Sequence, residues 1–331
     1  MNNKSPADTR MQTSAILAIS SLDRYSIATG QNQSQLLGVP LLNQFEVKGQ
    51  PCNNFTIYSG GALIYGYIKK IQISQTQIQY NIPTVVPNRN DTFYFVFQDI
   101  VYPVVIPFGY YTPEELAAVL EHKIRTAVPV NGGVVNPNLA AFTVVYTALD
   151  GFVFKTNNIY EFEFVPLETF LTFQTPSDVN TLLRTYRLIG MDISNTDPNV
   201  VQKSSSTPIF LYTSYIDIIS QVLTKYQKVK DTDSSPQKQA DIIARVYLAG
   251  TGAPQITSGD GSLPLGARPF TIVQDMNYCK TMRWSKDEAV NSLDFQLKDQ
   301  YGDLIFQNEP DNTDVYYTEF QMTLLCIEKQ D

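Results

Sequence analysis

The sequence predicts a mainly β protein, because apolar and polar residues alternate in many short runs, turn signals separate these runs, and only two segments have helical spacing. The clearest alternation runs from Thr92 to Gln98, where three phenylalanines share one face of the expected strand. Two further phenylalanine-rich runs follow, the first entered through the turn dipeptide Asp150-Gly151. Many strands with turn signals and two short helices describe a β-sandwich or jelly roll.

Two segments depart from the strand pattern and predict helices. The first begins with Thr112 at the N-cap, Pro113 in the first turn and Glu115 at the capping-box position. The apolar residues that follow recur at helical spacing: Leu116, Val119, Leu120 and Ile124. The single histidine, His122, lies off this apolar stripe, so we expect it to be exposed. A second short helix is expected within residues 178–191.

Composition limits the classes of protein that this chain can belong to. The 331 residues are 43% hydrophobic and 17% charged, which suits a packed core and argues against a disordered chain. No apolar stretch approaches 18 residues, so we expect no membrane-spanning helix. The formal net charge is −8, so we expect no direct binding to nucleic acid. The first residues lack the pattern of a secretory signal, and we expect synthesis in the cytosol.

The sequence shows no motif for catalysis or for a cofactor. A single histidine excludes the usual zinc sites with two or three histidines. The cysteines Cys52, Cys279 and Cys326 are far apart and odd in number, which favours small buried thiols in a reducing compartment. Glu161 and Glu163 alternate with phenylalanines, so we expect them to face water rather than to form a glycosidase pair. We therefore expect no enzyme, no metal and no cofactor.

Five short landmarks, taken in order, carry a resemblance to a known family. They are ISSLDRY at 19–25, IPFGYYT at 106–112, LIGM at 188–191, YIDIIS at 215–220 with DIIARV at 241–246, and LDFQLKDQYGDLI at 293–305. The residues that define them are Asp23, Arg24, Pro107, Gly109, Tyr111, Thr112, Gly190, Ile216, Asp217, Asp299 and Gly302. Each landmark marks an expected strand end, helix cap or turn, and none places a reactive group. In this order they resemble the penton, or minor capsid, proteins of virophages, polinton-like viruses and related large DNA viruses.

The resemblance implies a fold and a domain organisation. The family is built on a single jelly-roll β-sandwich, here with an inserted region that carries one or two short helices. We expect an extended N-terminal arm over residues 1–18 and a jelly-roll domain over 19–331. Within that domain we expect a helix-bearing elaboration at about 107–192 and an exposed Gly- and Ser-rich loop at about 250–266. One landmark departs from the family, because Ile189 and Met191 stand where leucine and phenylalanine are usual.

The resemblance also implies a function and partners. It implies a structural capsid protein that forms the pentameric vertex of an icosahedral double-stranded DNA virus. Its partners would be four further copies of itself and the neighbouring major capsid protein capsomers, with a host-surface receptor or glycan as a further partner. The protein would be made and assembled in the host cell and located in the virion.

Two alternatives stay open at this stage. The first is a minor capsid protein that cements capsomers at another position. The second is a carbohydrate- or receptor-binding β-sandwich, for which exposed aromatic residues on loops would be the signal. Trp284 and the Tyr316-Tyr317 pair are the candidates for that signal.

Overall fold

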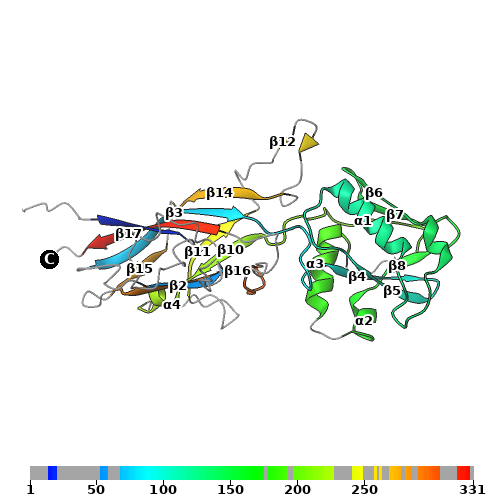
Figure 1. Cartoon of the computed structure of the whole chain (residues 1–331), viewed down its shortest axis with the longest axis horizontal. Helices are drawn as coiled ribbons and strands as arrows, with labels where there is room; N and C mark the ends of the chain where they lie inside the picture. The colour runs from blue at the N-terminus through cyan, green and yellow to red at the C-terminus, as the bar shows by residue number, and fades with distance from the viewer. Residues whose placement is uncertain are drawn as a thin grey trace, which may run out of the picture. The chain divides into compact units, whose positions relative to one another are not determined.

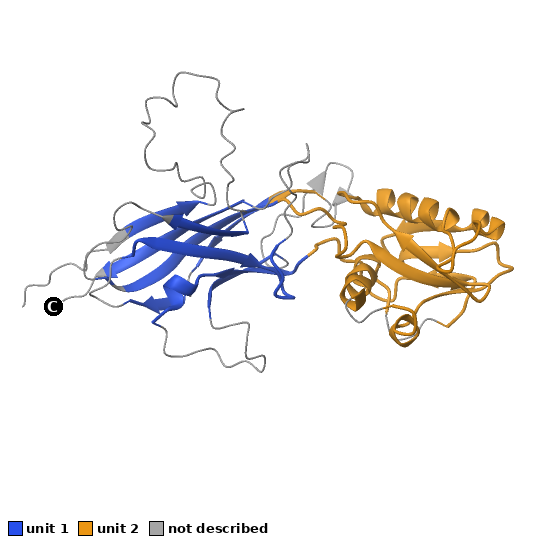
Figure 2. Ribbon diagram, turned by 60° about the horizontal axis from the view of Figure 1, so that its bottom comes forward, with its two compact units in different colours: residues 1–80, 213–250, 271–331 blue, residues 81–212, 251–270 orange. Residues whose placement is uncertain are grey.

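The structure of the chain is a computed structural model that divides into two compact units (Figure 2). Unit 1 comprises Met1–Tyr80, Thr213–Gly250 and Thr271–Asp331, and unit 2 comprises Asn81–Tyr212 and Thr251–Phe270. The described residues are 14–20, 53–58, 68–174, 178–192, 197–226, 241–248, 257–258, 261–262, 268–276, 280–284, 290–305 and 319–328.

Unit 1 is a sandwich of two antiparallel sheets, drawn as two layers in Figure 1. The first sheet has the order β1 (Ser14–Ser20), β17 (Glu319–Glu328), β3 (Ile68–Tyr80) and β14 (Phe270–Asp275). β15 (Thr281–Arg283) also pairs with β3. The second sheet has the order β11 (Ile242–Tyr247), β10 (Tyr215–Ile219), β16 (Ser292–Lys298) and β2 (Asn54–Tyr58).

The strand order identifies unit 1 as a jelly roll. With β1, β2, β3, β10, β11, β14, β16 and β17 lettered B to I in chain order, the sheets read B-I-D-G and C-H-E-F. This is the order that two interlocked Greek keys produce in an eight-stranded jelly roll. The predicted fold class is therefore confirmed.

The core of unit 1 lies between its two sheets. Phe55 on β2 and Phe295 on β16 both pack against Phe320 on β17, with ring centroids 5.6 and 6.1 Å apart. Along β16 the buried residues alternate with half-buried ones, as expected for a strand with one face on the core. A short helix, α4 (Gln221–Thr224), packs against β16, β11 and β15.

The larger segment of unit 2, Asn81–Tyr212, is inserted between β3 and β10 and has its own hydrophobic core. One three-stranded sheet has the order β5 (Ile100–Val105), β4 (Thr92–Phe97) and β8 (Phe162–Phe164), and the other has the order β6 (Thr143–Thr147), β7 (Gly151–Lys155) and β9 (Val201–Lys203). The helices are α1 (Pro113–Arg125), the 3-10 helix η3 (Pro137–Ala141), α2 (Leu167–Phe170) and α3 (Val179–Ile189). Aromatic rings from separate elements fill this core, with Phe142 and Phe162 only 4.7 Å apart.

Both predicted helices are present in unit 2. Thr112 caps α1: its hydroxyl accepts from the Glu115 amide at 3.3 Å, and the Glu115 carboxylate accepts from the Thr112 amide at 2.8 Å. His122 is exposed on α1, as its position off the apolar stripe indicated. The second helix, α3, lies inside the expected residues 178–191. Among the described helices, none is long and apolar enough to cross a membrane.

Three expected boundaries can be set against the structure. The N-terminal arm was placed at residues 1–18, but residues 14–18 are part of β1, because the apolar run there pairs with β17. The sequence predicts an elaboration at 107–192, whereas unit 2 starts at Asn81 and includes β4 and β5, which contribute to its core, and β9, which pairs with β7. The loop at 250–266 lies outside the described residues except for β12 (Thr257–Ser258) and β13 (Gly261–Ser262), which pair with each other.

Candidate functional site

The structure does not bring the landmark residues together into one site. Five of them lie in unit 2, namely Pro107, Gly109, Tyr111, Thr112 and Gly190. Four lie in unit 1, namely Ile216, Asp217, Asp299 and Gly302. Asp23 and Arg24 lie outside the described residues. Each landmark therefore acts at its own place in the fold.

The segment before α1 is held in place by its own hydrogen bonds. Gly109 and Val85 exchange two backbone hydrogen bonds, of 3.1 and 3.3 Å. The Tyr111 hydroxyl donates to the Pro107 carbonyl at 2.9 Å and closes the short loop between them. This loop delivers Thr112 to the N-cap position of α1, so the landmark has a capping role in the fold.

Gly190 ends α3, and both its backbone conformation and the lack of room for a Cβ favour glycine there. Its φ is +71°, in the left-handed region. A Cβ at this position would lie 2.3 Å from the carbonyl oxygen of Ser206. The Gly190 carbonyl accepts from the Ser206 amide at 3.0 Å, and the Ser204 hydroxyl donates to the Ile189 carbonyl at 2.7 Å. The end of α3 is thus tied directly to the segment that follows β9.

Asp217 forms the centre of a cross-strand cluster on the outer face of the second sheet of unit 1. Its two carboxylate oxygens accept from Nε and an Nη of Arg245, at 2.6 and 2.9 Å. The guanidinium lies over the Tyr215 ring, 4.0 Å from its centroid, and these hydrogen bonds raise the pKa of Arg245 further above its usual value. The neighbouring landmark residue Ile216 is fully buried and faces the core.

Three members of this cluster, Tyr215, Arg245 and Tyr247, are not among the defining residues of the landmarks, although Tyr215 and Arg245 lie within landmark segments. Tyr247 lies directly opposite Tyr215 in the register of β10 and β11, with ring centroids 6.0 Å apart. The available signal was the matched alternation of the two strands, in which Tyr215 and Asp217 share a face, as do Arg245 and Tyr247. We call Tyr215, Asp217, Arg245 and Tyr247 the Tyr–Arg cluster.

Asp299 and Gly302 build the turn that follows β16. One carboxylate oxygen of Asp299 accepts from the amides of Tyr301 and Asp303, at 2.9 and 3.0 Å. The Gly302 amide donates to the Asp299 carbonyl at 3.0 Å, and Gly302 has a φ of +80°. This is an Asx-type turn in which the aspartate side chain replaces backbone partners. The landmark therefore fixes a chain reversal.

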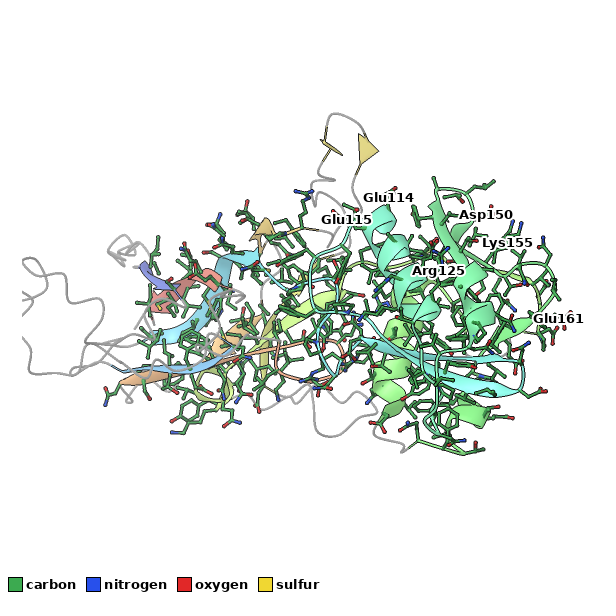
Figure 3. The ribbon with its side chains drawn as sticks, turned by 45° about the vertical axis from the view of Figure 1, so that its right-hand side comes forward. Glu114, Glu115, Arg125, Asp150, Lys155 and Glu161 are labelled. Carbon is green, nitrogen blue, oxygen red and sulfur yellow. The ribbon has the colours of Figure 1, made fainter. Side chains whose placement is uncertain are left out.

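The described residues contain no group of three or more histidine, cysteine, aspartate and glutamate side chains that could hold a metal ion. Glu161 is exposed and Glu163 is half-buried. The pKa of Glu163 is raised, mainly by burial and to a lesser extent by the nearby negative charge of Asp197. Figure 3 shows Glu114, Asp150 and Glu161 on separate elements of unit 2, with no convergence on one point. These three carboxylates therefore do not form an acid pair with one another.

The aromatic signal for a carbohydrate-binding module is not supported at Trp284. This side chain is only 8% exposed and packs edge-on against Tyr226, with ring centroids 5.4 Å apart. Tyr316 and Tyr317 lie outside the described residues. Cys326 is a buried free thiol whose pKa burial raises, as expected for a structural cysteine, and Cys52 and Cys279 lie outside the described residues.

Fold and site together define the class: a single jelly-roll β-sandwich that carries an inserted α/β unit and whose landmark residues cap, turn and brace the fold. The chain is similar in structure to the mavirus penton protein, with 10% sequence identity and a TM-score of 0.48 over 96% of this chain and 100% of that one. It is also similar to a chain of the Sputnik virophage, with 11% identity and a TM-score of 0.42 over 96% of this chain and 98% of that one. No family model and no curated protein matches the sequence.

Proposed function

We propose that the chain is a structural capsid protein that forms the pentameric vertex, or penton, of an icosahedral double-stranded DNA virus. The observation that carries the proposal is the position of the landmarks. Each one that the structure describes falls on a strand, cap or turn of the jelly roll or of its inserted unit, in the order that the family resemblance requires. These positions cap, turn and brace the fold, which is what a structural scaffold requires.

The physical properties of unit 1 suit such a subunit. A closed ring of five copies needs two different surfaces on each subunit that fit one another, which is a heterologous interface. A two-sheet sandwich supplies two such surfaces, because its two lateral sides consist of different strands. The low charged fraction of 17% reduces repulsion between neighbouring copies of a chain with a net charge of −8.

In this proposal the partners are other copies of the chain and the capsomers around the vertex, and the location is the virion. Synthesis and assembly take place in the host cell. The chain acts by packing and carries out no chemical step, so it requires no cofactor.

The oligomeric mass of the full chain in solution tests the proposal. We expect native mass spectrometry and light scattering to give the mass of five chains, and low-resolution particle images to show this ring at five-fold vertices. A trimer would contradict the vertex position and would favour another place in the capsid. A chain that stays monomeric and is absent from the vertices would contradict the ring itself.

A further inference from the structure

Unit 1 has two lateral sides that differ in their strands. On the first side lie the edge strands β1 and β2, one from each sheet. On the second side lie β11 from one sheet and β14 with β15 from the other. Contacts between the sheets confirm this alignment: the Lys280 amine donates to the Ile242 carbonyl at 2.9 Å, which joins the start of β15 to β11. Each side therefore presents one edge of each sheet.

Within the described residues, neither strand of the first side carries the sequence features that usually protect an edge strand. The strands β1 (SAILAIS) and β2 (NFTIY) contain no charged residue and no proline. The register between β1 and β17 runs over seven residue pairs without a bulge. Edge strands of monomeric proteins are usually interrupted by lysine, proline or a bulge, because an unprotected edge recruits other chains. Ile16 on β1 is also 72% exposed.

The second side carries the Tyr–Arg cluster. Tyr247 is 57% exposed on β11, which pairs only with β10 among the described strands. Tyr215 and Asp217 hold Arg245 in place, so little side-chain freedom is lost when a partner binds. Arg245 is the only charged residue of β11, and the carboxylate of Asp217 compensates its charge. Tyrosine and arginine are the residue types most enriched in the centres of protein interfaces.

The exposed large hydrophobic residues of unit 1 lie on these two sides. In the part of unit 1 that the structure describes they are Ile16, Tyr247 and Val273, and they belong to β1, β11 and β14. All three strands are edge strands. The outer faces of the inner strands β3 and β17 instead carry amides such as Gln77 and Gln321, which are exposed. When the exposed apolar side chains of a sandwich lie only on its edge strands, they indicate association through its lateral sides.

We propose that the β1–β2 side of one copy packs against the β11–β14 side of the next, with Tyr247 and Arg245 as the anchors and Ile16 at the receiving surface. The inference rests on the proposed ring of copies and names the two surfaces that form it. A second copy is the occupant because the two sides differ, as a closed heterologous ring requires. The charges of the two sides allow the same occupant. Two chains of net charge −8 repel each other overall, but β1 and β2 carry no charge and Asp217 compensates the charge of Arg245. The two exposed charges on β14 and β15, Asp275 and Arg283, are of opposite sign.

Two substitutions with a matched control test the side assignment. Ile16→Lys and Tyr247→Lys each place a charge on one side, and Leu149→Lys places the same charge on unit 2, at a position that is 93% exposed. All three residues are exposed, so each variant is expected to keep the wild-type melting temperature. We expect Ile16→Lys and Tyr247→Lys to weaken self-association at least about 30-fold, the loss typical of a central anchor, and Leu149→Lys to leave it unchanged.

A mixture of the two variants tests the direction of packing. Each variant keeps one intact side, so the mixture should form a heterodimer by native mass spectrometry, although each variant alone is monomeric. If Tyr247→Lys assembles alone into symmetric dimers, like sides pair with like and the assignment is overturned.

The remaining outcomes separate this inference from the proposed function. If the wild-type chain and both variants are all pentameric, the side assignment is wrong, but the proposed vertex function is not contradicted. If a segment of the same chain covers β1 and β2, Ile16→Lys lowers the melting temperature without changing the oligomeric mass, which overturns the assignment in the same way. A wild-type chain that is monomeric and absent from vertices overturns both.

Discussion

The end of α3 at Gly190 offers a sharp test of how this chain holds its inserted unit together. Replacing Gly190 with alanine adds one methyl group at a φ of +71°, where side chains are disfavoured by about 1–2 kcal/mol. The new Cβ would also lie 2.3 Å from the Ser206 carbonyl oxygen, well inside any normal contact distance. That oxygen belongs to the backbone, so relief requires the chain to move.

The displacement would disturb bonds that join α3 to the segment after β9. The Ser206 amide donates to the Gly190 carbonyl at 3.0 Å, and Pro208 Cδ lies 3.1 Å from the added Cβ position. Ser206 is exposed, so loss of one such backbone hydrogen bond costs about 0.5–1.5 kcal/mol. Together with the conformational cost, we expect Gly190→Ala to lower the free energy of unfolding by about 2–3 kcal/mol.

Gly132 provides the matched control. Its φ is +80°, similar to that of Gly190, but a Cβ there would meet nothing within 4 Å. Gly132→Ala should therefore show only the conformational cost, about 1 kcal/mol, partly offset by the stiffer unfolded chain. Urea unfolding followed by fluorescence and circular dichroism measures both variants. Equal destabilisation by the two substitutions would refute the steric argument.

Three further substitutions probe the cap, the ion pair and the half-buried acid. Thr112→Ala should cost about 1 kcal/mol of unfolding free energy and Thr112→Ser much less, because only the first removes the capping hydroxyl of α1; urea unfolding that shows no difference between them contradicts the capping role. Asp217→Asn should lower the free energy of unfolding by about 1–2 kcal/mol, because the amide keeps one acceptor oxygen and replaces the other with an NH2 group that cannot accept from Arg245, a half-buried partner; a double-mutant cycle with Arg245→Met measures the coupling. The raised folded pKa of Glu163 means that its protonated form favours folding, and this contribution is lost as pH rises through that pKa. Glu163→Gln should thus raise the melting temperature at neutral pH and have little effect in mildly acidic buffer; an equal shift at both pH values argues against burial as the cause.

Local features of the fold could be predicted from the sequence because their signals lie within a few residues. The alternation around Phe93, Phe95 and Phe97 predicts β4, and all three side chains are buried. The capping residues before α1 predict its start, and both capping hydrogen bonds are present. Short-range periodicity and capping chemistry do not depend on the rest of the chain, so such elements are recognisable in isolation.

Long-range pairing could not be predicted in the same way. β1 and β17 lie at opposite ends of the chain and pair over seven residues, and no periodicity within β1 indicates its partner. The misplaced boundary of the N-terminal arm follows from this, because Ser14–Ser20 gain their structure from a strand some 300 residues later. The sequence suggests that Trp284 is an exposed aromatic residue on a loop, because its ring partner Tyr226 lies far away in the sequence.

The chain has two separate hydrophobic cores, so the folding of the inserted unit is distinct from the ring contacts that we propose for the jelly roll. Every residue of the large aromatic cluster, from Val85 to Phe210, belongs to the inserted unit, so this unit folds around contacts that the jelly roll does not share. The surfaces that we assign to the ring belong to β1, β2, β11 and β14, all of them strands of unit 1. In this proposed assignment, exposed aliphatic residues of unit 2 such as Val134 and Leu149 lie outside the ring surfaces, so we expect substitutions there to leave the ring intact. Because loops on a rigid scaffold change most readily, we also expect the exposed loops of unit 2 to tolerate variation.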